Sequence, residues 1–263
     1  MYATFIFFYT CLKVKVYRKD KDINADEFVL DFEDAVAESE NELAFSNVAK
    51  IQNSATFWVR PRLFGKCGEI NNKQLEALFD LGFKRFVLPK ISTSQQLHDI
   101  YNIFDYYDVA DYQWIILLEG PRALCNISAL FEDHEYPIKG ISLGAQDYAA
   151  EVGMSFSNER INWARNVVLN AAYAYNFEAI DFASMSITDS DKFRDEALEG
   201  FKMGYTAKMV LHPNQLQVLN DIQYYSAEEI DHALRIAKQI DFSKLTDFSV
   251  ITIDGQLYEK PHL

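Results

Sequence analysis

The 263-residue sequence predicts an α/β protein with the TIM (β/α)8 barrel fold, built as a single domain over residues 1–263. Eight short, β-rich apolar runs alternate with stretches whose apolar residues recur at helical spacing. The runs are almost continuously apolar, as the strands of a parallel sheet buried on both faces require. An open doubly wound sheet gives the same local pattern, but the count of eight and the absence of a glycine-rich fingerprint after the first run favour the barrel.

Each predicted strand is a run rich in β-branched and aromatic residues, which favour pleated structure. In chain order the runs are TFIFFYT (4–10), FVLDF (28–32), TFWVRP (56–61), RFVLPK (85–90), WIILLE (114–119), KGISLG (139–144), EAIDF (178–182) and AKMVLH (207–212). No basic residues precede the first run and no clear small-residue cleavage site follows it, so we interpret it as a buried strand and not as a signal peptide.

Helices are predicted where apolar residues recur every three or four positions. Examples are NKQLEALFDLG (72–82), RINWARNVVLNAAYAY (160–175) and SAEEIDHALRIAKQI (226–240). Gly82 stands at the end of the first helix, where a left-handed residue commonly stops helical structure. Ser226 and Glu229 have the spacing of a capping box at the start of the last helix.

The composition excludes several classes of partner. The net charge of −14 argues against nucleic acid and against an anionic membrane surface, since both require clustered basic residues. No apolar run approaches the roughly 18 to 20 residues that a membrane helix needs. The three cysteines, Cys11, Cys67 and Cys125, are spaced too irregularly for a zinc site or a disulfide framework. We therefore expect a cytoplasmic protein.

Polar residues follow most of the predicted strands, at the end of the barrel where enzymes of this fold bind their substrates. These residues are Asp31, Glu33, Arg60, Lys90, Glu119, Asp147, Asp181, Lys208 and His212. We expect several of them to converge on one face. Each also has a purely structural interpretation: Glu119 precedes a turn into a helix that begins with Pro121, and Asp34 is interpreted as the N-cap of the next helix.

The pair Glu119 and Asp147 predicts a metal site, because the two residues follow neighbouring strands and would share one mouth of the barrel. Two carboxylates with room for water suit Mg²⁺, and Mn²⁺ would also fit. Zinc is not expected, since no cluster of cysteine and histidine offers a softer site. Arg60 would supply a planar fork for a substrate carboxylate.

Six segments, in order along the chain, resemble the citrate lyase β-subunit-like enzymes of the HpcH/HpaI aldolase superfamily. They are LDFEDAV, VRP, VLPK, LLEGPRAL, SLGAQDYAAEVG and GYTAKMVLHPNQL, and the resemblance runs from about residue 26 to 215. It implies a Mg²⁺-dependent barrel, assembled as a homo-oligomer such as a trimer or hexamer. Such enzymes cleave or form a carbon–carbon bond beside a carboxylate, often in a CoA thioester.

The resemblance also implies roles for individual residues. Glu119 and Asp147 match the metal ligands, and Arg60, Gly144 and Ala145 match positions that bind the substrate. Asp31, Glu33 and Lys90 would surround them, with Asp31 and Glu33 bonding metal-bound water and orienting Arg60. Near the end, YEKP stands where relatives often have an Asp-x-Pro element, which makes Glu259 the candidate proton donor.

Several positions depart from the pattern of that family: Asn41, Phe45, Arg62, Gly120 and Ala207. The expected function is Mg²⁺-dependent retro-aldol or retro-Claisen cleavage of a thioester such as citryl-, malyl- or citramalyl-CoA. One alternative is an aldolase acting on a free small 2-oxo acid, and another is a non-catalytic accessory protein that retains the fold. No general base is evident, because His212 is equally well explained as a turn residue before Pro213.

Overall fold

The computed structural model describes residues 4–11, 25–132, 136–239, 250–253 and 255–259. The chain divides after Asp221 into two compact units, Met1–Asp221 and Ile222–Leu263. The assignment of residues 1–263 to a single domain stays a prediction.

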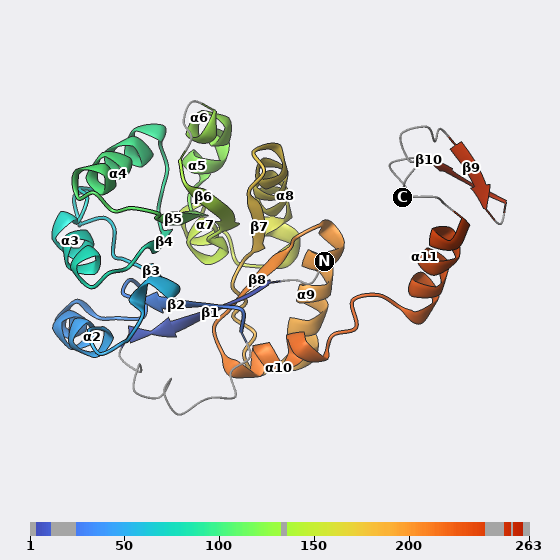
Figure 1. Cartoon of the computed structure of the whole chain (residues 1–263), viewed down its shortest axis with the longest axis horizontal. Helices are drawn as coiled ribbons and strands as arrows, with labels where there is room; N and C mark the ends of the chain where they lie inside the picture. The colour runs from blue at the N-terminus through green and yellow to red at the C-terminus, as the bar shows by residue number, and fades with distance from the viewer. Residues whose placement is uncertain (1–3, 12–24, 133–135, 240–249, 254, 260–263) are drawn as a thin grey trace. The chain divides into compact units, whose positions relative to one another are not determined.

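The first unit is a closed barrel of eight strands in chain order, and every neighbouring pair is parallel (Figure 1). The strands are β1 (Thr4–Thr10), β2 (Glu27–Asp31), β3 (Trp58–Arg60), β4 (Arg85–Leu88), β5 (Gln113–Leu118), β6 (Ile138–Leu143), β7 (Glu178–Asp181) and β8 (Ala207–Val210). Pairing of β8 with β1 closes the barrel. The predicted TIM barrel is confirmed, and each predicted strand overlaps an observed one.

Helices connect the strands. They are α2 (Asn41–Val48), α3 (Asn72–Asp80), α4 (Ser94–Tyr106), α5 (Pro121–Cys125), α6 (Ile127–Phe131), α7 (Ala145–Glu151), α8 (Asn158–Ala174), α9 (Ser190–Met203) and α10 (Pro213–Asp221), with short 3-10 turns at Glu38–Glu40 and Ser54–Thr56. Gly82 has a φ of 80° just after α3, as its position predicts. Helix α8 begins earlier than its apolar pattern indicates, because the Ser157 hydroxyl accepts a hydrogen bond from the Arg160 amide and caps it.

Alternation along the strands divides the core into two layers. One face of every strand except β6 contributes apolar side chains to the cluster in the barrel interior, where the buried residues are Ile6, Phe8, Val29, Trp58, Val87, Ile115, Leu117, Ile180, Ala207 and Met209. Residues of the opposite face, such as Leu88, Ile116 and Phe86, belong to a second cluster shared with the helices. A polar residue at a strand end therefore faces the barrel mouth or the helices according to its parity.

The second unit contains α11 (Ala227–Gln239) and an antiparallel hairpin of β9 (Val250–Ile253) and β10 (Gln256–Glu259). The capping box of α11 is confirmed, because the Ser226 amide donates to Glu229 and the Glu229 amide donates to the Ser226 hydroxyl. Tyr258 Oη lies 2.8 Å from His232 Nε2 and links the hairpin to α11. Across the described ranges, every helix is too short or too polar to cross a bilayer.

Candidate active site

A pocket of about 290 Å³ lies at the carboxyl ends of the barrel strands. Six of the residues predicted from sequence line it: Asp31, Arg60, Glu119, Gly144, Ala145 and Asp147. Glu33 and Lys90 do not line the pocket but contact the residues that do. Glu259 ends β10 in the second unit and is exposed, and Pro261 of the same segment lies outside the described residues. The role of Glu259 stays a prediction.

Arg60 is held against Asp31 by a two-point ion pair. Its Nε and Nη2 atoms lie 2.8 and 2.6 Å from the two carboxylate oxygens, and both residues end their strands on the interior parity. Nη1 lies 3.3 Å from Glu33 and 3.4 Å from Asp34, and the guanidinium sits 5.3 Å from the Phe8 ring centroid. All three guanidinium nitrogens thus lie near protein carboxylates, and the Nε edge is the more tightly held, because the contacts of Nη1 are the longest.

Glu33 forms ion pairs with both Arg60 and Lys90. The Lys90 ammonium contacts Glu33 Oε1, and the Lys90 backbone takes a left-handed conformation with a φ of 58°. Burial raises the pKa of Glu33, although Arg60 and Lys90 oppose the shift. Glu33 Oε2 accepts no hydrogen bond from the part of the chain that the structure describes.

Asp34 does not cap a helix, contrary to its interpretation from the sequence. It lies in a turn, and the next helical residues begin only at Glu38. Its carboxylate is more than half exposed, with a relative side-chain accessibility of 57%, and lies within ion-pair distance of Arg60 and Lys90. Asp34 therefore lies at the rim of the pocket and not at the start of a helix.

Glu119 is the most strongly perturbed carboxyl group of the pocket. Its side chain follows β5 on the interior parity and the residue is only 4% exposed. Burial, reinforced by the charges of Glu33 and Asp147, raises the pKa of Glu119 to about 8. Its Oε2 atom is buried without a hydrogen-bond partner among the described residues. A buried carboxylate oxygen of this kind is satisfied by a proton or by a bound cation.

Gly144 makes room for Glu119. A Cβ atom at position 144 would stand 2.2 Å from Glu119 Cγ, which no side chain tolerates. Helix α7 starts directly after this glycine, and its first turn presents Asp147, which is exposed at the pocket. The glycine therefore lets a buried and an exposed carboxylate line the same pocket.

The donor set fits a hard divalent cation. Within the described ranges, no group of three or more His, Cys, Asp or Glu side chains is arranged to hold a metal ion. Mg²⁺ does not need such a group, because it keeps several waters and uses one or two protein carboxylates. Glu119 and Asp147 provide that number of hard oxygen ligands, and Mn²⁺ would accept the same set.

Comparison with known proteins agrees with this geometry. A family model described as HpcH/HpaI aldolase/citrate lyase matches residues 5–213. The chain belongs to this family. Citrate lyase subunit beta of Leuconostoc mesenteroides subsp. cremoris is 24% identical over 255 residues, which are 92% of this chain and 84% of the relative. A (3S)-malyl-CoA thioesterase of Cereibacter sphaeroides is 24% identical over 256 residues, covering 95% of this chain and 87% of the relative.

A solved structure confirms the fold of this HpcH/HpaI family member. It is the protein CitE of Mycobacterium tuberculosis, crystallised with magnesium, acetoacetate and coenzyme A. The TM-score is 0.80 at 22% sequence identity, and the match covers 99% of this chain and 94% of the other. The family resemblance inferred from the six sequence segments is confirmed by the match of the family model.

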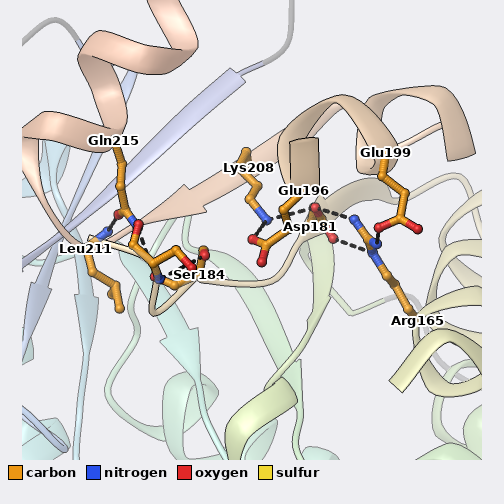
Figure 2. A network of polar contacts seen from close by, with 9 residues as sticks. Arg165, Asp181, Ser184, Glu196, Glu199, Lys208, Leu211 and Gln215 are labelled. Atoms are coloured by element: carbon orange, nitrogen blue, oxygen red, sulfur yellow. Dashed lines mark hydrogen bonds and ion pairs between the residues drawn. The ribbon is translucent and has the colours of Figure 1, made fainter. Parts of the chain in front are cut away.

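Asp181 and Lys208, two of the strand-end residues, do not join the pocket, in which several of the others meet. Both have the outward parity, and they belong to a buried network with Arg165 of α8 and Glu196 of α9 (Figure 2). Arg165 donates to both oxygens of Asp181 at 2.9 and 2.8 Å. Lys208 Nζ lies 2.9 Å from both Asp181 and Glu196. These ion pairs link helices α8 and α9 to strands β7 and β8 of the barrel.

His212 has the structural role that its position before Pro213 allows. Its Nδ1 atom accepts a hydrogen bond of 3.2 Å from the Asn214 amide at the start of α10. Arg62, one of the departures from the family pattern, also has a structural role: its Nη2 donates to the carbonyl oxygens of Glu33 and Val36 at 3.1 and 2.6 Å. It thus holds the loop after β2, which the sequence pattern alone does not reveal.

Proposed function

We propose that the chain is a Mg²⁺-dependent carbon–carbon lyase that cleaves a hydroxyacyl-CoA thioester by retro-aldol or retro-Claisen chemistry. The observation on which the proposal depends is the buried oxygen of Glu119, which has no protein partner in the described residues and belongs to a pocket shared with Asp147 and Arg60. The names of the relatives support an acid or thioester of the citryl, malyl or citramalyl type.

In this proposal Glu119 and Asp147 hold the cation. When bound, Mg²⁺ supplies Lewis-acid stabilisation of the negative charge that develops on the substrate oxygen as the bond breaks. Arg60 binds the substrate carboxylate through its Nη1 and Nη2 edge, while Asp31 keeps the guanidinium in place. Asp31 and Glu33 thereby act on the substrate through Arg60.

The other walls of the pocket are mostly apolar and would surround the rest of the acyl group. They are formed by Phe8, Leu117, Leu143, Ala183, Met185, Met209 and Leu211. Such walls exclude water and strengthen the electrostatic contacts of Arg60 with the substrate. Gly144 and Ala145 line the same pocket, and the absence of a Cβ atom at Gly144 leaves room for the Glu119 side chain.

The proposal is tested by product analysis with malyl-, citramalyl- and citryl-CoA and with the corresponding free acids. We expect Mg²⁺-dependent release of an oxo acid together with an acyl-CoA, measured as the phenylhydrazone and by chromatography. Release of free thiol without an oxo acid would indicate a thioesterase instead. Cleavage of free acids alone would favour the aldolase alternative, and inactivity together with absent oxalate binding would favour the accessory protein.

A matched pair of variants connects the activity to the pocket. Glu119→Gln removes a metal-binding carboxylate from a site built to stabilise charge, so turnover should fall at least about a hundredfold. The melting temperature should not fall, because the substitution removes a charge that burial disfavours. Glu159→Gln, at the exposed start of α8, is the control and should leave turnover unchanged.

A further inference from the structure

Gln215, near the start of α10, links two loops at the mouth of the barrel. The residue is 1% exposed, and its Oε1 accepts hydrogen bonds from the amides of Leu211 and His212 at 2.8 and 3.2 Å. Its Nε2 donates to the carbonyl oxygens of Ser184 and Ser186 at 2.9 and 3.2 Å. Figure 2 shows the side chain reaching from α10 to both segments.

The two loops linked by Gln215 form one apolar wall of the pocket. Ala183 and Met185 come from the segment after β7, and Met209 and Leu211 come from β8 and the residue that follows it. Gln215 does not line the pocket itself. It is separate from the carboxylates and from Arg60, which lie at the ends of β2, β3, β5 and at α7.

Only an amide can make this set of contacts. Backbone N–H groups can only donate and carbonyl oxygens can only accept, so the four partners fix which end of the side chain is oxygen and which is nitrogen. Glutamate has the same shape but would direct a carboxylate oxygen at the carbonyl groups of Ser184 and Ser186. The link to the loop after β7 would then be replaced by repulsion, while the link to Leu211 would persist.

We propose that Gln215 is a positioning residue that sets the spacing of these two loops and thereby the fit of the acyl part of the substrate beyond its carboxylate. The inference rests on the proposed function for its kinetic consequence. Its structural consequence, the placement of Met185 and Met209, does not depend on that function. Gln215 determines which acyl substituents fit, whereas Glu119, Asp147 and Arg60 determine whether the reaction occurs.

The variant Gln215→Glu tests the kinetic part. Loss of two buried hydrogen bonds should raise KM for the preferred acyl-CoA about tenfold, with kcat within about threefold of the wild type. The ratio of kcat/KM between citramalyl-CoA and malyl-CoA, which differ by one methyl group, should also change. Oxalate affinity in saturating Mg²⁺ should stay the same, because oxalate occupies only the carboxylate end. A fall in kcat and oxalate affinity with unchanged KM would overturn the proposal.

The structural part is tested without turnover, by NMR of methionine methyl groups. In Gln215→Glu the signals of Met185 and Met209 should shift, while that of Met154, which packs in the outer cluster, should not. Gln96→Glu is the matched control, because Gln96 also accepts from two backbone amides, those of Ser92 and Thr93, but lies outside the pocket.

Unmoved Met185 and Met209 signals would overturn the inference even if the proposed lyase activity fails. Equal shifts at Met154 would overturn it as well, because they would indicate a general structural effect. If Gln215→Glu does not fold, Gln215→Asn takes its place. Asparagine keeps donor and acceptor but is one methylene too short to reach both loops, so the same shifts are expected.

Discussion

The molecule contains two clusters of charges at the carboxyl side of its barrel, and they differ in how completely they are paired. At the pocket, Glu119 leaves one buried oxygen without a hydrogen bond within the described residues. On the β7–β8 side, Asp181 accepts from Arg165 and from Lys208, and none of its atoms is left without a partner. Both clusters are buried, so burial alone does not distinguish a binding site from a structural one.

The difference teaches that a buried carboxylate marks a candidate ligand site where one of its oxygens is left without a hydrogen bond beside a pocket, as in Glu119. A paired and buried ion network has no capacity left for an external cation. The two faces of a strand alternate from residue to residue, and the face on which a residue lies determines which cluster it joins. Asp31, Arg60 and Glu119 face the interior, whereas Asp181 and Lys208 face the helices.

The largest effect is expected from a substitution that breaks the paired cluster of Asp181, Arg165 and Lys208. Asp181→Asn leaves Arg165 and Lys208 buried with too little negative charge, and should lower the free energy of unfolding by about 3 to 5 kcal/mol. Glu199→Gln is the control, because Glu199 pairs with Arg165 from a side chain that is 51% exposed. Loss of the Glu199 carboxylate should lower the free energy of unfolding by at most about 1 kcal/mol. Urea unfolding measures both, and equal costs would remove the distinction between the two clusters.

A smaller effect is expected at the pocket. Arg60→Lys keeps the charge but cannot make both bonds to Asp31 or present a planar edge to a ligand. Oxalate affinity and turnover should each fall about tenfold or more, in line with about 1.5 to 3 kcal/mol for a hydrogen bond to a charged group. Calorimetry in saturating Mg²⁺ checks the affinity.

Arg85→Lys serves as the control for Arg60, since Arg85 starts β4 at the opposite end of the barrel and pairs with Glu27. It should leave oxalate binding unchanged. If Arg60→Lys instead lowered the melting temperature and spared oxalate binding, Arg60 would belong with the structural network.

The most gradual effect is a pH dependence of metal binding and of stability. Glu119 has a folded-state pKa of about 8 against an ordinary 4.5, so the metal-free folded protein binds a proton that the unfolded chain releases. Stability of the metal-free protein should therefore fall as the pH rises from about 4.5 to about 8.

Mg²⁺ must displace that proton from Glu119. The affinity of the protein for Mg²⁺ should rise by up to about tenfold per pH unit below pH 8 and level off above pH 8. Calorimetric titration between pH 6 and 9 measures this, and Glu119→Gln should reduce the pH dependence of stability by the contribution of Glu119. A flat profile in the wild type would show that Glu119 is already ionised without metal.

Sequence patterns predicted the barrel and most of the pocket because both depend on local features. Eight apolar runs were sufficient for the strands. Arg60 ends β3, Glu119 directly follows β5 and Asp147 lies in the first turn of α7 after β6, so their positions needed little knowledge of loops. Orientation was harder, because a shift of one residue reverses the face of a side chain. This explains why Asp181 and Lys208, which belong to the strand-end residues named from the sequence, face outward and not into the mouth.

Other features depend on contacts between distant segments, which no local pattern encodes. Asp34 was interpreted as a helix cap, but the turn that contains it continues to Glu38 before a helix begins. Arg62 and Gln215 bind backbone groups of loops more than 25 residues away, at separations of 26 and 31. The β9–β10 hairpin consists of two short strands with Gly255 between them and was likewise not predicted.

The Asp181–Lys208 pair has one more consequence, for how the barrel closes. The two residues are register partners across β7 and β8, and both extend into a layer that also contains Arg165. If β7 slipped by one position, Ile180 would meet these cations and the Asp181 carboxylate would enter the apolar interior. The buried ion pairs thus disfavour a barrel in which β7 and β8 pair in a shifted register. Charges that do not contact a substrate therefore help to set the shear of the barrel.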